Sequence, residues 1–229
     1  MENNLEINEF MEEETTTLLK RILYIFADPK RAFESLKENP KILGVYLIGL
    51  LISSATLIWS YLDGTSEKLF IDSLVQTGQH VTEQVVIMGK FITLFGGILA
   101  FAVGPIIIAF FYHIIVMINS ETGYKKTLSI TRHASLIASL NTLISLFVLK
   151  LAGITLQFSP AMFLDINAIN SILYTLISFV DIFVFWRVVV LFIGFRTTHN
   201  LSTKGALITA IIPDLVLYAI ALITVSIII

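Results

Sequence analysis

The stretch FITLFGGILAFAVGPIIIAFFYHIIVMI, residues 91–118, decides the fold because it runs for 28 residues without aspartate, glutamate, lysine or arginine. A bilayer core needs about 20 consecutive apolar residues per helix, so this segment is long enough to cross a membrane. Its length predicts a tilt, a kink at Gly104-Pro105 or a protruding end. Four other runs meet the same criterion. The predicted spans are Ile42–Leu62, Phe91–Ile118, Ala134–Leu156, Ile169–Phe195 and Gly205–Ile229.

The composition agrees with these spans. Hydrophobic residues make up 56% of the 229-residue chain and charged residues only 14%, whereas a soluble domain carries roughly 25% charged residues. We therefore predict an all-α polytopic membrane protein, a five-helix bundle in contact with the lipid bilayer. There is no cysteine, which excludes disulfides, thiolate metal sites and cysteine nucleophiles. The net charge of −2 gives no support for nucleic-acid binding.

The distribution of lysine and arginine predicts the orientation. Eleven basic residues lie before the first span or in the loops after the second and fourth spans, and two lie in the loops on the other side. Cytoplasmic loops are enriched in these residues. The N-terminus is therefore expected in the cytoplasm and the C-terminus outside, with the protein in the cell membrane.

Two segments precede the bundle, which covers residues 41–229. Residues 1–16 contain six glutamates and read as a disordered acidic tail. Residues 17–40 carry two short amphipathic patterns, the second opened by Asp28 as cap and Pro29 at the first helical position. They favour helices at the cytoplasmic membrane interface, and the alternative is a cap packed on the bundle. The polar outer segment of residues 63–90 predicts one or two helices lying on the outer surface.

Four ionisable residues fall within the predicted spans: Lys150, Asp181, Arg187 and Asp214. A charge inside the bilayer is costly, so each needs a partner or a wet cavity. At about 1.5 Å of rise per residue, Lys150 and Asp181 lie at one depth and Arg187 and Asp214 at another. We therefore predict the pairs Lys150–Asp181 and Arg187–Asp214. Such pairs either set helix register or form a proton or ion relay, in which case His113 and Asn141 could extend the path.

Small residues recur at four-residue spacing on two spans. The first stripe is Gly96, Ala100 and Gly104, and the second contains Ala134 and Ala138. Such stripes let helices approach closely, either inside the bundle or against a partner helix, so a homo-oligomer stays open. The pair His80 and Glu83 has metal-like spacing but lacks a third ligand, and no metal or cofactor is expected. No metalloprotease, serine-hydrolase or phosphate-loop motif is present, so we expect no enzyme.

Several short motifs resemble one family. They are Ile25-Phe-Ala-Asp-Pro29 with Phe33 and Pro40, the turn Gly123-Tyr-Lys-Lys-Thr-Leu-Ser129, and the run Asp181-Ile-Phe-Val-Phe-Trp186, Leu191-Phe-Ile-Gly-Phe-Arg196 and Leu201-Ser-Thr-Lys-Gly-Ala206. From about Ile22 to the C-terminus the chain is similar to the Yip domain family, named for proteins that interact with Ypt/Rab GTPases. The matching positions are Pro29, Phe33, Pro40, Asp181, Trp186, Gly194, Arg196, Ser202 and Lys204.

The resemblance implies a function as well as a topology. Five spans with a cytoplasmic N-terminus is the family's architecture. The compact loops and the lack of cysteine favour a bacterial member, which has no Rab partners. Bacterial members occur as accessory proteins beside exporters, and the length and the start Met1-Glu-Asn-Asn-Leu5 resemble one that assists an ABC exporter against a toxic peptide. The implied partners are a membrane-fusion protein and an ABC permease. The alternatives are a transporter or ion-conducting protein that uses the four intramembrane charges, and an intramembrane enzyme.

Overall fold

The computed structural model describes residues 17–76, 78–120, 123–153, 158–164 and 172–228, and within these residues there is no strand. The helices are listed here in chain order. They are α2 (Leu18–Ala27), α3 (Pro29–Glu34), α4 (Leu43–Leu62), α5 (Thr65–Gln76), α6 (Glu83–Phe91), η1 (Ile92–Gly96), α7 (Gly97–Asn119), α8 (Tyr124–Ala152), η2 (Pro160–Phe163), α9 (Ile172–Ser178), α10 (Ile182–Thr198) and α11 (Thr203–Ile228).

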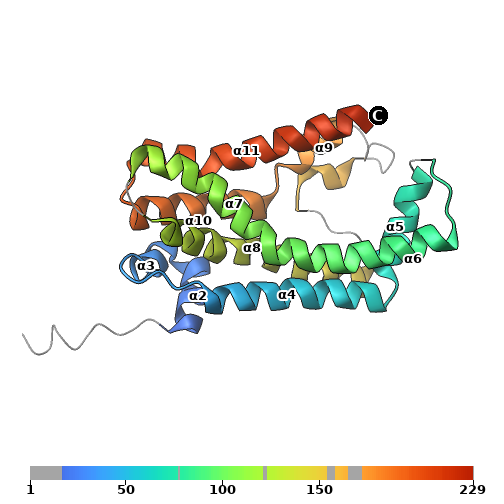
Figure 1. The fold of residues 1–229 in the computed structure, drawn as a ribbon, viewed down its shortest axis with the longest axis horizontal. Coiled ribbons are helices and arrows are strands. Elements are labelled where there is room, and N and C mark those ends of the chain that lie inside the picture. The colour runs from blue at the N-terminus through green and yellow to red at the C-terminus, as the bar shows by residue number, and fades with distance from the viewer. Residues whose placement is uncertain (1–16, 77, 121–122, 154–157, 165–171, 229) are drawn as a thin grey trace, which may run out of the picture.

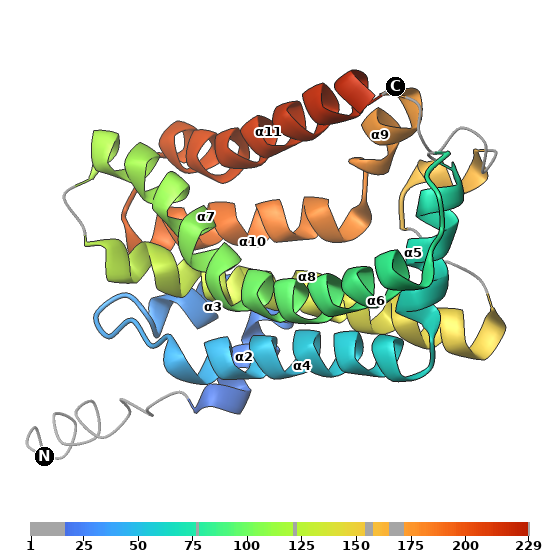
Figure 2. The same cartoon turned by 45° about the vertical axis from the view of Figure 1, so that its right-hand side comes forward.

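The long helices run side by side, and the short ones gather at the two ends of the bundle (Figure 1). We call the end with α2 and α3 the N-terminal end, and the end with α5, α9 and the C-terminus the opposite end. Between α4 and α11, the helices α8 and α10 form the middle of the bundle (Figure 2).

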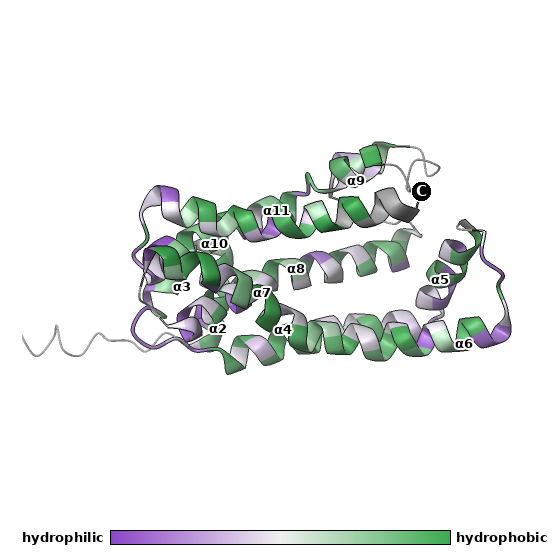
Figure 3. Ribbon diagram, turned by 45° about the horizontal axis from the view of Figure 1, so that its top comes forward, coloured by the Kyte–Doolittle hydropathy of each residue, from purple (hydrophilic) through white to green (hydrophobic). Residues whose placement is uncertain are grey.

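Four helices of the described chain are long and apolar enough to cross a membrane, and a fifth span results if α9 and α10 count as one broken helix. Hydrophobic residues cover the long helices and hydrophilic residues concentrate toward the ends (Figure 3). Because apolar side chains such as Leu51, Ile107 and Phe185 are exposed, the outer surface suits hydrocarbon rather than water. The chain is an all-α multi-pass membrane protein, as predicted.

Two span boundaries differ from the sequence prediction. The second helix is continuous from Glu83 to Asn119 rather than starting at Phe91, with a π-helical turn at Ile92–Gly96. Residues 83–90, which the sequence assigned to the outer segment, therefore extend this span. The other outer helix, α5, packs against this extension, where Phe70 leaves no room for a side chain at Gly89. The third helix begins at Tyr124, ten residues before the predicted start, because the polar residues of its first turns face the protein.

The predicted fourth span is broken. Helices α9 and α10 are bent by 50° relative to each other. Asp181 lies at the break and accepts hydrogen bonds from the backbone N–H groups of Phe183 and Val184, at 2.7 and 3.1 Å. A carboxylate that caps the first turn of a helix favours a helix start at that position. The part of this predicted span at residues 169–171 lies outside the described residues.

The N-terminal helices α2 and α3 pack against the bundle. Ile25, Ala32, Phe33 and Leu36 are fully buried in the main core, and burying an isoleucine, leucine or phenylalanine side chain contributes about 1.5–3 kcal/mol. The contacts of α2 and α3 are therefore those of a cap packed on the bundle, which was the alternative prediction. The predicted apolar stripe of α2 points partly outward, because Leu19 and Leu23 are exposed. This exposed apolar face is compatible with a location of α2 at the membrane interface, which stays a prediction.

Candidate functional site

Among the described residues, the most buried ion pair joins α10 to α11. Arg187 Nη2 lies 2.6 Å from Asp214 Oδ2, and Tyr112 from α7 donates a hydrogen bond of 2.8 Å to Asp214 Oδ1. The Asp214 side chain is only 6% exposed and that of Arg187 20%. Three helices thus contribute one residue each, and both oxygens of the carboxylate accept a donor. This is the pairing expected from the matching depths of Arg187 and Asp214.

A cavity of about 360 Å³ adjoins this ion pair. Tyr218 lines it beside the pair, and Pro105, Ser135 and Ala138 line the side toward α7 and α8. The same three residues line a second cavity of about 130 Å³, which reaches Ser53 and Arg132. The walls of the first cavity are mostly apolar, and Thr131, Ser135 and Tyr218 supply polar side chains beside the ion pair.

The predicted pairing of Lys150 with Asp181 is wrong. Lys150 Nζ forms an ion pair with Asp63 and a hydrogen bond with Thr65, while Asp181 caps α10. Asp63 follows the last residue of α4. The pKa of Asp63 is lowered to about 2, mainly because its carboxylate accepts a hydrogen bond from the Lys150 ammonium group. This contact ties α8 to the start of α5 at the opposite end of the bundle.

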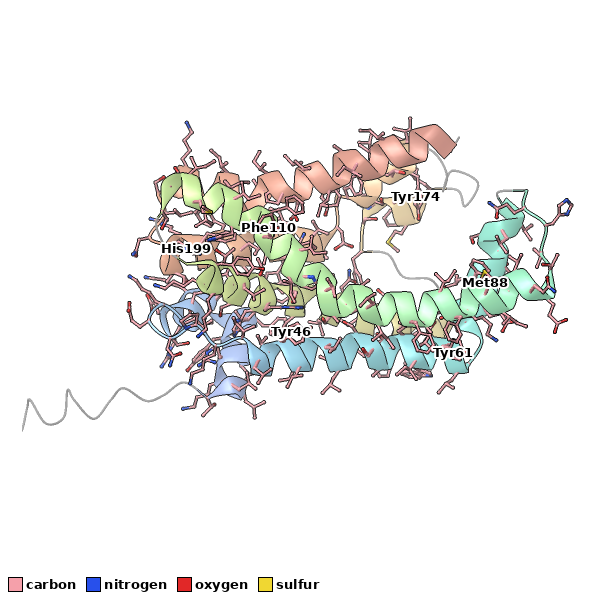
Figure 4. All side chains as sticks on the ribbon, viewed as in Figure 1. Tyr46, Tyr61, Met88, Phe110, Tyr174 and His199 are labelled. Atoms are coloured by element: carbon pink, nitrogen blue, oxygen red, sulfur yellow. The ribbon has the colours of Figure 1, made fainter. Side chains whose placement is uncertain are left out.

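Arg132 is an intramembrane charge that sequence reasoning missed. It was counted as a loop residue, but it is 4% exposed and lies inside α8. Its guanidinium stacks on Tyr46 at 3.8 Å and donates to the Ala102 carbonyl at 3.1 Å. Tyr46 points from α4 toward α7 (Figure 4) and donates to the same carbonyl. Ala102 lies just before Pro105, where a proline weakens the helical hydrogen bonding.

The N-terminal end holds a buried histidine network. His199 Nε2 lies 3.0 Å from the Thr127 hydroxyl, which lies 2.9 Å from His113 Nδ1. His199 follows α10 at this end of the bundle (Figure 4). Burial lowers its pKa to about 4, with contributions from His113 and Lys126. In the relay alternative, His113 and Asn141 were the residues that could extend the path. Asn141 does not reach this network, because its Oδ1 accepts a hydrogen bond from Ser145 on its own helix.

Several motif positions meet where α3 docks on α10. Asp28 caps α3 with Pro29 in its first turn, and this places Phe33 against Gly194, where an added Cβ would lie 3.0 Å from the ring. Trp186 packs edge-on against Phe26, with ring centroids 5.4 Å apart. The remaining motif positions lie away from this contact. Pro40 precedes α4, Arg196 and Lys204 are exposed, and Ser202 accepts a hydrogen bond from the Gly205 N–H at the start of α11.

The two small-residue stripes have different surroundings. Ala134 is buried in the core, and Ala138 lines both of the cavities described above. Gly96 and Ala100, in contrast, are exposed, and the space beside Gly104 is open to 4 Å. The neighbouring Gly97, which the prediction did not include, makes the close contact inside the bundle, with Leu57. In the described residues, no group of three or more histidine and acidic side chains could hold a metal ion.

Comparison with known proteins gives the class to which this geometry belongs. A sequence model of the Yip1 domain matches residues 23–225, so the chain belongs to the Yip1 domain family. It is also 28% identical over 218 residues to membrane protein YknW of Bacillus subtilis (strain 168), covering 93% of this chain and 91% of the relative. This is the bacterial member to which the length and the N-terminal sequence pointed. No solved structure matches the chain.

Proposed function

We propose that this protein is a non-enzymatic membrane scaffold that binds other membrane proteins through its helix faces, chiefly α7. The observation that carries this proposal is how little of that helix the bundle covers. Only 6% of the most apolar stretch of the Glu83–Asn119 helix is buried, compared with 17% for α4, 28% for α8 and 33% for α11. The exposed small residues Gly96 and Ala100 lie on this helix. Small residues allow the close approach by which membrane helices associate.

The intramembrane charges support a structural role. Arg187 with Asp214, and Lys150 with Asp63, form ion pairs within the chain. Paired charges of this kind hold neighbouring helices in register. They also lower the penalty of placing ionised groups near hydrocarbon.

The proposed partners follow from the family resemblance. We infer a membrane-fusion protein and an ABC permease, whose assembly or action this chain assists in an export system. The proposed location is the cell membrane, with the N-terminus in the cytoplasm and the C-terminus outside. The distribution of basic residues supports this orientation, since they concentrate in the segments at the N-terminal end of the bundle.

Photo-crosslinking in native membranes tests the helix face. A photoreactive amino acid replaces Ala100, and the control position is Leu51, which is 68% exposed on α4. We expect protein adducts, identified by mass spectrometry as permease or membrane-fusion protein, from position 100 only. Equal adducts from both positions would contradict the proposal. Adducts containing only a second copy of this chain would replace it by a homo-oligomer.

Bulky substitutions separate partner binding from folding. Gly96→Leu with Ala100→Leu should abolish the adducts and leave the protein folded, because an added Cβ at Gly96 meets only Ile92 of the same helix, at 3.9 Å. Gly97→Leu is the contrasting variant, since its Cβ would lie 2.6 Å from Leu57. It should lower the stability of the bundle itself.

A transporter or ion-conducting protein is the second candidate, favoured by the cavity that adjoins Arg187 and Asp214. An ionisable residue inside a membrane next to a water-filled cavity is typical of substrate or proton pathways. Ion or proton flux through liposomes that contain only the purified protein tests this function. Flux that Asp214→Asn abolishes without unfolding the protein would favour the transporter over the scaffold.

A further inference from the structure

A basic cavity of about 280 Å³ lies at the N-terminal end of the bundle, between α2, α4 and α8. Three of the residues that line it carry basic side chains, Arg21, Lys41 and His133, and no acidic side chain of the described residues lines it. Arg21 is 3% exposed, and its Nε donates to Ser35 at 3.2 Å. The Ser129 hydroxyl holds the Lys41 carbonyl at 3.0 Å, which fixes the backbone at the mouth of the cavity. The charge of this space therefore suits an anion.

The start of α4 adds backbone donors to the same space. No side chain caps this helix at Ile42, and Gly44 and Val45 from its first turn line the cavity. The first N–H groups of a helix lack partners within the helix and carry the positive end of its dipole. A phosphate or another anion is the usual ligand of such a helix start. Here the helix start and the positive charges of Arg21 and Lys41 point to the same ligand.

His133 provides the second, independent observation. The side chain is fully buried and lines the cavity. Its Nδ1 lies 2.7 Å from the Ser129 carbonyl on its own helix, so Nδ1 carries the proton. Nε2 lies on the other side of the ring and has no hydrogen-bond partner among the described residues. A buried polar atom without a partner is costly, and a hydroxyl on a bound ligand would satisfy it.

The helices α2 and α4, which line the cavity, also carry exposed apolar side chains. Leu19 and Leu23 from α2 are 72% and 66% exposed, and Leu43 and Leu47 from α4 are 70% and 45% exposed. They suit acyl chains and not water. We propose that this cavity binds the phosphate of an anionic lipid headgroup, with Arg21, Lys41 and the α4 start on the phosphate and His133 accepting from a headgroup hydroxyl. Phosphatidylglycerol carries both groups.

Native mass spectrometry of the full chain in detergent, with added lipid, tests the proposal. We expect phosphatidylglycerol to bind and phosphatidylcholine to bind far less. Lys41→Gln should weaken phosphatidylglycerol binding about fivefold, the usual effect of one basic residue at an anionic lipid surface. The Lys41 side chain is exposed, so the variant should fold. Lys125→Gln removes the same charge from an exposed position outside the cavity and should change nothing.

Three results would overturn the assignment. The first is equal binding of the two lipids, or equal effects of the two substitutions. The second is full displacement of the lipid by millimolar inorganic phosphate, which would make the ligand a soluble phosphate. The third is binding that begins only after deletion of residues 1–16, which would mean that the glutamates of that segment occupy the cavity instead of a lipid.

Discussion

We predict that replacing the two residues of the Arg187–Asp214 ion pair has unequal effects on the stability of the protein. Asp214→Leu leaves a guanidinium that cannot lose its proton. Removing one partner of a buried pair costs about 3–5 kcal/mol, and we expect about 3 kcal/mol because the Arg187 side chain keeps 20% exposure. Arg187→Met should cost less, about 1–2 kcal/mol, because the carboxyl of Asp214 can protonate and keep its hydrogen bond with Tyr112.

The double variant, Arg187→Met with Asp214→Leu, should recover most of the stability. Replacing both partners of a buried pair by apolar residues is often neutral or stabilising, so with a double variant within about 1 kcal/mol of the wild type the expected coupling energy is about 3–5 kcal/mol. Tyr112→Phe removes one hydrogen bond inside the membrane and should cost only about 0.6–1.7 kcal/mol.

Unfolding by sodium dodecyl sulfate in mixed micelles, followed by tryptophan fluorescence, measures these differences. Trp186 precedes Arg187 in α10 and reports on this part of the bundle. A double variant that loses as much stability as the two single variants added together would refute the reasoning, because the two side chains would then not interact. Single variants with wild-type stability would refute it as well.

Other contacts give shorter predictions. Gly194→Ala should cost about 1–3 kcal/mol by crowding Phe33 and Ile130, and Phe33→Leu in the same chain should return part of it in the same unfolding assay. The depressed pKa of His199, about 4, means that the unfolded chain binds the proton more tightly. The stability from neutral His199 is therefore complete above about pH 6.5 and is lost as the pH falls toward 4, by up to ~3 kcal/mol, and unfolding of His199→Gln should lack this pH dependence. Lys150→Met should cost less than about 1 kcal/mol because its ion pair is partly exposed, yet it should speed proteolysis within α5. A tag after residue 229 should be accessible from outside intact cells, and a tag that is protected there would contradict the proposed orientation.

Hydropathy predicted the spans because each membrane helix makes its backbone hydrogen bonds within itself. Such a helix can therefore be identified from its own sequence, without knowing its neighbours. The pair of Arg187 with Asp214 followed from the same logic, since both residues lie within unbroken helices. The pairing of Lys150 with Asp181 failed because the carboxylate of Asp181 caps the first turn of α10 at the break in the predicted fourth span, which an estimate of depth does not reveal. It also left out Asp63, which ends α4.

The missed features share a physical cause. Arg132 seemed to be a loop residue because the apolar run begins after it, although α8 begins at Tyr124. Its partners are a ring and a backbone carbonyl, which have no signature in the sequence. The amphipathic pattern of residues 17–40 could not distinguish lipid from protein as the contact of its apolar face. In the structure α2 has both, with Ile25 in the core and Leu23 exposed.

The two ends of the bundle also differ in how their charges are balanced, and this bears on the orientation. At the opposite end, Lys150 pairs with Asp63 and Lys90 with Glu67, at 2.7 Å for the second pair. These ion pairs balance two lysines of that end, and Lys68 on α5 is a third among the described residues. At the N-terminal end, lysines such as Lys41 and Lys125 are exposed, so their positive charges can interact with a negatively charged surface. The cytoplasmic leaflet is such a surface, so charge balance and the loop distribution of basic residues favour the same side of the membrane for this end.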